Sequence, residues 1–389
     1  MKPPESDPVK RRLDRCCDLG DLRKAARRLI PRPVFDYVDG GADEELSTRD
    51  NVGAFRRWRF RPHALVDVSA PDLSGEVLDG AVAMPLALCP TGYTRMMHPA
   101  GETAVANAAR RHGLPYTLST MAATSIEDVA LTGHGNLWFQ LYILKDRGLT
   151  REFTDRAAAC GYRVLAVAVD TVVAGSRLRD LRNGLTIPPE LTVRSLASIG
   201  SRPAYWMRML SSPAIKFANF TAQHPGISIE ETASLFSPAI TWGDIAELRE
   251  RWTGKLVIKG PLGAADARRA AELGADGIWL SNHGGRQLDR TIAPADLIPE
   301  VREALGPGPA VIVDSGIRHG ADIATAVALG ADAGAVGRAY LYGLMAGGEP
   351  GVDRVLDLLR LQYTRTLQLM GLTSTAELRA HGRELLTRS

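Results

Sequence analysis

From residue 84 onward, short apolar runs alternate with amphipathic, alanine-rich segments. We predict strands over residues 85–89, 115–119, 137–141, 164–169, 256–259, 277–281, 310–314 and 333–337. Helical patterns follow most of these runs, over residues 101–112, 146–160, 264–273 and 322–329. Repeated strand–helix units with buried strands are typical of an α/β protein with a parallel sheet. Eight units favour a closed (β/α)8 TIM barrel, and an open doubly wound sheet is the alternative, because periodicity alone does not show closure.

The spacing is regular except between residues 170 and 256, where a proline- and aromatic-rich segment separates the fourth and fifth strands. A loop of that length usually forms a lid, an interface or a membrane contact. Residues 1–22 are charged and contain prolines without an apolar core, so we expect a poorly ordered tail, not a signal peptide or membrane span. We expect residues 23–389 to form a single domain, with an N-terminal helical segment, a barrel from about residue 84 and an insertion over about 184–240.

Composition restricts the class of protein. The 389 residues are 45% hydrophobic and 23% charged, which is typical of a globular enzyme and excludes a disordered chain. The net charge is +3, and the sequence has no basic run with interleaved aromatic residues, which argues against nucleic-acid binding. Cys16, Cys17, Cys89 and Cys160 lack the spacing of metal ligands, so we expect reduced thiols in a cytoplasmic protein without a metal site.

Reactive side chains follow the predicted strands, at the barrel end where chemistry takes place. They are Thr91, Ser119, Gln140, Tyr142, Asp170, Lys259, His283, Arg286, Asp314, Arg318 and Arg338. His283 and Arg286 lie three residues apart around a glycine pair, just after the apolar run 277–280. A histidine accepts a proton near neutral pH and an arginine binds a carboxylate, so the pair suits an acid substrate that must lose a hydrogen.

Residues 314–318 and 337–338 follow the seventh and eighth strands, where barrels commonly bind phosphate. They predict a phosphate-bearing cofactor, and turn glycines with solvated arginines are the alternative. Lys259 ends an apolar strand and needs an anionic or electron-rich partner, which is either a flavin ring or an acid such as Asp314. Asp170 either orients His283 or caps the next segment.

Residues 281–289 resemble the signature of the FMN-dependent α-hydroxy-acid dehydrogenase and oxidase family. The resemblance extends from about residue 30 to 378, with Val34-Phe35-Asp36-Tyr37, Pro90-Thr91-Gly92, Phe139-Gln140-Leu141-Tyr142 and Val257-Ile258-Lys259-Gly260 in family order. It implies FMN as cofactor and oxidation of an L-2-hydroxy acid to the 2-oxo acid.

The resemblance also implies roles for individual residues. It makes His283 the catalytic base and Asp170 its orienting partner. The substrate carboxylate and hydroxyl are assigned to Tyr37, Tyr142, Arg177 and Arg286. The FMN contacts are assigned to Thr91, Gly92, Ser119, Gln140, Lys259, Ser281, Asp314, Gly316, Arg318, Gly337 and Arg338.

Three positions depart from the family pattern. Ala168 stands where many members have a threonine that contacts the flavin. Met121 and Gly92 stand where glycolate oxidase has tryptophan and alanine, so both alter the pocket around the substrate side chain. Gly92 and Met121 would admit a substrate bulkier than glycolate, and core packing is the alternative for Met121.

Residues 171–180 and 341–344 resemble bacterial L-lactate and mandelate dehydrogenases more closely than glycolate oxidase, which favours a dehydrogenase. Residues 202–210 are aromatic and basic at helical spacing. A peripheral membrane contact through about 202–220, on the inner face of the membrane, is one interpretation, and a lid or subunit-contact helix is the other. The resemblance further implies a homo-oligomer, a tetramer or larger.

We therefore expect oxidation of lactate or an aryl acid such as mandelate, with a quinone, another protein or oxygen as electron acceptor. Residue types leave open whether the substrate carbon loses hydride or forms a carbanion. One alternative is the same flavin chemistry on an unusual substrate from a biosynthetic or peptide-maturation pathway. Another is a non-catalytic FMN-binding barrel, against which the presence of a base with its orienting acid argues.

Overall fold

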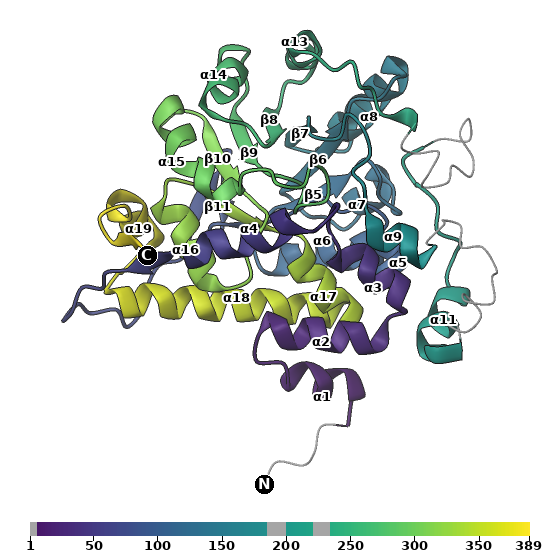
Figure 1. The fold of residues 1–389 in the computed structure, drawn as a ribbon, viewed down its shortest axis with the longest axis horizontal. Helices are drawn as coiled ribbons and strands as arrows, with labels where there is room; N and C mark the ends of the chain where they lie inside the picture. Colours follow the sequence, from purple (N-terminus) through teal and green to yellow (C-terminus); the bar gives the residue numbers. More distant parts are fainter. Residues whose placement is uncertain (1–5, 185–199, 221–233) are drawn as a thin grey trace.

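The computed structural model describes residues 6–184, 200–220 and 234–389. Eight parallel strands close into a barrel in the order β10-β11-β4-β5-β6-β7-β8-β9 (Figure 1). The strands are β4 (Leu86–Leu88), β5 (Tyr116–Ser119), β6 (Leu137–Tyr142), β7 (Val164–Ala168), β8 (Lys255–Gly260), β9 (Gly277–Leu280), β10 (Ala310–Val313) and β11 (Ala333–Val336). Each lies on a predicted apolar run, so the predicted TIM barrel is confirmed and the open sheet is excluded.

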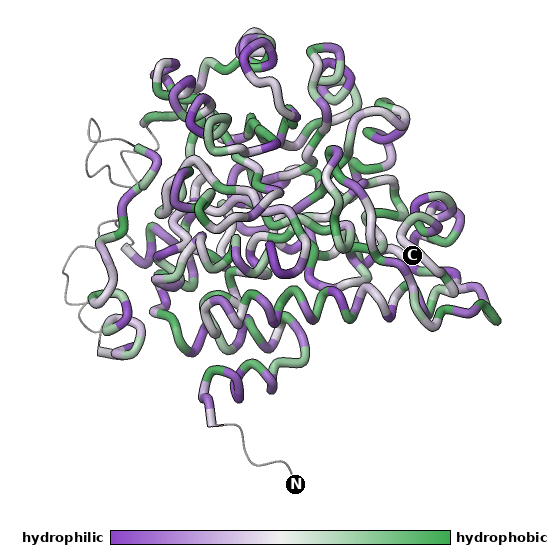
Figure 2. Tube along the Cα trace, turned by 180° about the vertical axis from the view of Figure 1, so that it is seen from behind, coloured by the Kyte–Doolittle hydropathy of each residue, from purple (hydrophilic) through white to green (hydrophobic). Residues whose placement is uncertain are grey.

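Helices cover the outside of the barrel. Those that follow the strands are α6 (Gly101–Arg111), α7 (Ile126–Ala130), α8 (Arg147–Ala159), α13 (Trp242–Arg251), α14 (Ala264–Glu272), α15 (Pro294–Leu305), α16 (Gly320–Ala328) and α17 (Arg338–Gly347). The short α5 (Thr94–Met97) precedes α6, and α18 (Glu349–Met370) and α19 (Thr375–His381) end the helical part. The long α18 alternates hydrophilic and hydrophobic positions, as expected for a helix with one face on the core (Figure 2).

A β-hairpin closes the end of the barrel opposite the strands' carboxyl ends. Its strands are β2 (Gly75–Val77) and β3 (Gly80–Val82), and Leu78 in its turn lies against Gly277 at the start of β9. Val77, Leu78 and Val82 belong to the same buried cluster as the barrel-interior residues. Trp138 and Trp279 meet edge to face inside the barrel, with ring centroids 6.0 Å apart. Side chains therefore fill the barrel interior, beginning at the end that the hairpin closes.

The N-terminus corrects one expectation. Residues 8–22 are not a poorly ordered tail: they form α1 (Pro8–Asp14) and the start of α2 (Leu19–Leu29). Leu13, Cys16, Leu19 and Leu22 are buried at a spacing of three residues, and α1 and α2 pack on α17. The prediction was wrong because this apolar stripe stands among many charged residues.

The rest of the N-terminal segment leads to the barrel. The helices α3 (Arg32–Asp39) and α4 (Leu46–Arg56) follow α2, and β1 (Trp58–Phe60) pairs with β12 (Leu386–Arg388) near the other terminus. In Figure 1, α4 runs across the middle of the molecule beside the barrel, and α3 lies to one side near α9. This segment therefore brings residues from before the barrel to the edge of the site.

The predicted insertion lies between β7 and β8. Its described helices are α9 (Leu178–Asn183) and α11 (Pro203–Leu210), which precede α13. The parts of the predicted insertion at 185–199 and 221–233 lie outside the described residues. Across the ranges that the structure describes, no helix has both the length and the apolar character needed to cross a membrane.

We predict that Leu22→Ala lowers the free energy of unfolding by about 2–5 kcal/mol, because it removes fully buried methyl groups between α2 and α17. Urea unfolding measures the change. The control Leu369→Ala, at a side chain 78% exposed on α18, changes the free energy by less than about 0.5 kcal/mol. Equal effects of the two substitutions would show that α2 unfolds apart from the barrel.

Candidate active site

A pocket opens at the carboxyl ends of the barrel strands. All predicted site residues line it except Asp170 and Ser281. Asp170 contacts the His283 ring from behind, and Ser281 contacts Lys259 and Asp314. The fold thus brings together Tyr37 from α3, residues at or just after the carboxyl ends of all eight barrel strands, and Arg177 at the N-terminal end of α9.

His283 presents one ring nitrogen to the pocket and the other to a carboxylate. Its Nδ1 lies 3.2 Å from both carboxylate oxygens of Asp170, and its Nε2 lies 3.4 Å from the Tyr142 hydroxyl. The Asp170 side chain is only 4% exposed. A carboxylate at Nδ1 places the ring proton there, which leaves the lone pair of Nε2 directed toward the pocket.

The surroundings of His283 fix the protonation states of its two partners, Asp170 and Tyr142. Burial works against the Asp170 carboxylate, but His283, helped by Lys259 and Thr171, holds the pKa of Asp170 below its ordinary value. Burial and the nearby Asp170 charge raise the pKa of Tyr142. Asp170 therefore remains an anion and Tyr142 a neutral phenol that donates a hydrogen bond.

Two arginines flank the ring of Tyr37, which α3 places at the pocket wall. The Arg286 guanidinium lies 4.9 Å from the ring centroid and that of Arg177 lies 5.6 Å from it. Arg286 donates to the carbonyl oxygens of Tyr37 and Gly40. Burial, followed by the charge of Arg177, lowers the pKa of Arg286. Two close guanidiniums at a buried site favour an anionic ligand.

Lys259 is a buried cation held by two side chains. Its Nζ lies 2.6 Å from the Ser281 hydroxyl and 3.0 Å from the Asp314 carboxylate. Burial alone would lower the pKa of Lys259, but the charges of Asp314 and Asp170 outweigh it and raise the pKa. The ion pair with Asp314 named as an alternative is therefore present, and both residues also line the pocket.

The strand ends of β10 and β11 carry two further arginines. Arg338 donates to the backbone carbonyls of Val38, Gly40 and Gly284, which leaves two of its five N–H groups for other partners. Arg318 makes no ion pair with a carboxylate of the described residues. Gly316 and Gly337 line the pocket just after the neighbouring strands β10 and β11, so backbone N–H groups and a guanidinium can hold a phosphate there.

Other parts of the wall fit a flavin ring. The Nε2 of Gln140 is buried at the pocket wall without a hydrogen-bond partner in the described chain, while its Oε1 accepts from the Ser119 hydroxyl at 3.0 Å. A buried amide donor without a partner indicates a ligand acceptor. Thr91 is fixed by the Tyr340 hydroxyl at 2.7 Å, and a Cβ at Gly92 would lie only 3.1 Å from that of Met121.

Several aromatic residues of the pocket wall were not predicted from the sequence. Phe217 and Phe236 return from the insertion to line the pocket, where Phe217 meets Tyr93 and Phe236 meets Tyr142 at ring-centroid distances of 4.3 and 4.9 Å. Tyr93 follows the predicted motif 90–92 directly, so its position was a usable signal. The two phenylalanines follow no strand, and no pattern in the insertion marks them. Met121 and Ala168, two of the departures from the family pattern seen in the sequence, also line the pocket.

Comparison with known proteins agrees with this geometry. Residues 26–385 match the family model for FMN-dependent dehydrogenases. The chain belongs to this family.

Relatives in the FMN-dependent dehydrogenase family match almost the full chain. A putative L-lactate dehydrogenase of Mycobacterium tuberculosis is 44% identical over 96% of this chain and 91% of its own. The (S)-mandelate dehydrogenase of Pseudomonas putida is 41% identical over 90% and 89%. A crystal structure described as monotopic membrane protein (S)-mandelate dehydrogenase superposes with a TM-score of 0.92 at 38% identity, covering 96% of this chain and all of its own.

Membership settles the class of reaction. The protein is an FMN-dependent 2-hydroxy-acid dehydrogenase, an oxidoreductase that acts on a CH–OH group. The family implies a 2-hydroxy-acid substrate and an electron acceptor. The unpartnered Gln140 amide and the glycine- and arginine-lined end of the pocket fit FMN.

We predict that Arg318→Met weakens FMN binding by roughly 10- to 100-fold, the effect of losing a charge-assisted phosphate contact. Fluorescence titration of the deflavinated protein with FMN measures it. Riboflavin, which lacks the phosphate, serves as the control ligand and should bind equally to both proteins. An equal loss for both ligands would place Arg318 away from the phosphate.

Proposed function

We propose that the enzyme oxidises an L-2-hydroxy acid, lactate or an aryl acid such as mandelate, to the 2-oxo acid. The observation that carries the proposal is the His283–Asp170 pair facing a pocket with two arginines. A base with an orienting acid supports proton removal from the substrate, and a pair of guanidiniums supports a carboxylate.

His283 is the proposed base. Its Nε2 accepts a proton from the substrate, and the imidazolium that forms is stabilised by the buried Asp170 carboxylate at Nδ1. FMN, when bound, supplies the acceptor for the electron pair that the substrate loses. The Tyr142 hydroxyl lies beside Nε2, so it can donate a hydrogen bond to the substrate hydroxyl and help to place it.

The substrate carboxylate is assigned to Arg286 and Arg177, with the Tyr37 hydroxyl as a further donor. Fixing the carboxylate at one end and the hydroxyl near His283 leaves a single orientation for the hydrogen on the α-carbon. The FMN ring is assigned to Thr91, Gly92, Ser119, Gln140 and Lys259, with Ser281 behind Lys259. The phosphate is assigned to Asp314, Gly316, Arg318, Gly337 and Arg338.

The remaining wall supports a bulky side chain. Met121, Phe217, Phe236 and Tyr93 are apolar or aromatic, and Gly92 presents no side chain. Aromatic side chains pack favourably against a further ring in offset or edge-to-face arrangements. These contacts favour an aryl acid such as mandelate, whereas lactate would leave part of the apolar wall uncovered.

The acceptor and the location of the enzyme form a second part of the proposal. On α11, Met207 and Leu210 are 65% and 82% exposed, beside Arg202 and Arg208. Apolar and basic residues on one short helix suit the surface of an anionic membrane, and the similar solved protein is described as monotopic. We propose a cytoplasmic homo-oligomer, a tetramer or larger. It attaches peripherally to the inner face of the membrane through about 202–220. It reduces a quinone, and another protein or oxygen is the alternative acceptor.

Anaerobic mixing with L-lactate and, separately, (S)-mandelate tests the substrate. We expect (S)-mandelate to bleach the visible flavin absorbance, and bleaching by lactate alone would contradict the aryl preference. A yellow protein that neither acid bleaches would overturn the proposed substrate class in favour of an unusual substrate.

His283→Gln should slow flavin reduction by roughly 10²- to 10⁴-fold, because the glutamine amide cannot accept the proton. Stopped-flow absorbance measures the rate, and the unchanged flavin spectrum shows that FMN is still bound. His381→Gln, at an exposed position of α19, is the matched control. Reduction at the wild-type rate in His283→Gln would remove His283 from the role of base.

A further inference from the structure

Arg177 lies directly before the short helix α9, which lacks the packing that usually fixes a helix. It has six residues, and none of them is buried. A helix of this length is not stable by itself, and without buried apolar side chains the hydrophobic effect does not position it. The placement of Arg177 therefore comes from polar contacts: the backbone N–H of Asp43 donates to the carbonyl oxygen of Ser176 at 2.8 Å, and the side chains of α9 make further contacts.

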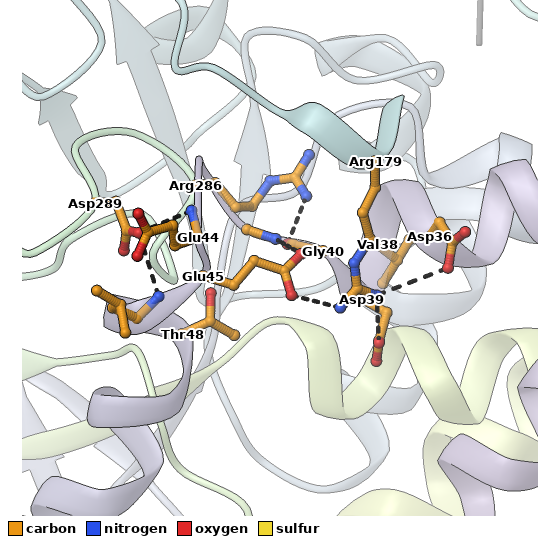
Figure 3. A network of polar contacts seen from close by, with 12 residues as sticks. Asp36, Val38, Asp39, Gly40, Glu44, Glu45, Thr48, Arg179, Arg286 and Asp289 are labelled. Carbon is orange, nitrogen blue, oxygen red and sulfur yellow. Dashed lines mark hydrogen bonds and ion pairs between the residues drawn. The ribbon is translucent and has the colours of Figure 1, made fainter. Parts of the chain in front are cut away.

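Those contacts run to the N-terminal segment. Arg179 makes ion pairs with Asp39 at 3.1 Å, with Asp36 at 3.7 Å and with Glu45 (Figure 3). Asn183 adds a hydrogen bond to Asp36 at 2.9 Å. Figure 3 shows the Arg179 side chain reaching from its own element to this acidic group. Arg179 and Asn183 thus both join α9 to α3, and Arg179 also joins it to the start of α4.

The acidic partner of Arg179 is itself firmly held. Asp39 receives two hydrogen bonds from Arg23, at 2.6 and 2.7 Å, and one from the Tyr342 hydroxyl at 2.8 Å. Burial opposes its charged form, but Arg23, Tyr342 and Arg179 lower the pKa of Asp39 to about 2. A carboxylate at a helix C-terminus is unfavourable toward the helix dipole, so Arg23 and Arg179 also stabilise the end of α3.

Both elements that Arg179 joins contribute to the carboxylate end of the pocket. Tyr37 lies two residues before Asp39, and Arg177 lies two residues before Arg179. Arg177 in turn lies over the Tyr37 ring and 3.6 Å from Asp180 on its own helix. A shift of α9 relative to α3 would therefore move Arg177 away from Tyr37.

We propose that Arg179 is a positioning residue for carboxylate binding: by tying α9 to Asp39 and Glu45 it holds Arg177 over Tyr37. The inference rests on the proposed role of Arg177 in the substrate site. Arg179 does not line the pocket, so its effect passes through Arg177.

The test measures binding of phenylacetate, which has the carboxylate and ring of an aryl substrate but no hydroxyl to oxidise. Perturbation of the flavin absorbance of the holoenzyme gives the dissociation constant. Arg179→Met should raise it on the order of tenfold, because a misplaced guanidinium loses most of a charge-assisted contact. The neutral phenylacetamide should bind equally to both proteins.

A matched control comes from the same acidic cluster. Arg32, the first residue of α3, pairs with Asp36 of the same helix at 3.2 Å, and its side chain is 85% exposed. Arg32→Met should leave the phenylacetate dissociation constant unchanged within about twofold. A tenfold effect of this control would show that general charge near α3, and not the tie to α9, controls binding.

A double-mutant cycle separates positioning from direct binding. Arg177→Met should weaken phenylacetate binding strongly, and adding Arg179→Met to it should cause no further loss. Independent, additive losses, an unchanged constant in Arg179→Met, or an equal loss for phenylacetamide would each overturn the proposal. If Arg179→Met does not fold, Glu45→Gln removes one partner of Arg179 and should give a smaller change of the same sign.

The two proposals fail in different ways. A wild-type holoenzyme that binds phenylacetate no better than phenylacetamide contradicts the carboxylate site itself, and with it the proposed function. A wild-type enzyme that prefers the carboxylate, with a variant at Arg179 that prefers it equally, contradicts only the positioning role.

Discussion

The backbone at His283, Gly284 and Gly285 is left-handed at three consecutive residues, with φ of 58°, 68° and 73°. For histidine this conformation is unfavourable, so the surrounding structure must hold it. Asn51 and Asn282 exchange two buried hydrogen bonds, Gly285 receives the N–H of Ala42, and Ser281 and Ser315 accept from the loop. The N-terminal segment therefore supports the turn that directs the histidine into the pocket.

The same dependence explains why the helices before the barrel are integral to the enzyme. Arg338 and Arg286 donate hydrogen bonds to the carbonyls of Tyr37, Val38 and Gly40. At the start of α4, the Asp289 carboxylate accepts from the backbone N–H groups of Glu44, Leu46 and Ser47. Backbone groups satisfied in this way stay buried without penalty. The barrel supplies the strand ends, and the N-terminal segment completes one wall of the pocket.

The barrel could be predicted from its apolar runs because each buried strand has a continuous run of its own. The pocket residues at strand ends could be predicted for the same reason. Closure of the sheet brings together the carboxyl ends of strands such as β8, which contains Lys259, and β9, which precedes His283. The stripe formed by Leu13 and Leu22 was hidden among charges. The return of Phe217 and Phe236 depends on the path of the insertion, and the contacts of Arg338 with carbonyls are not encoded by residue type.

The hairpin β2–β3 has a consequence for the order of events. With Leu78 and its neighbours closing the floor beneath Trp138 and Trp279, the described barrel offers no passage through its axis. The pocket lies at the carboxyl ends of the strands, so the 2-hydroxy acid and the electron acceptor approach from the same end of the described barrel. An acceptor that needs close contact with the flavin would then follow the departure of the 2-oxo acid, the order of events that gives ping-pong kinetics.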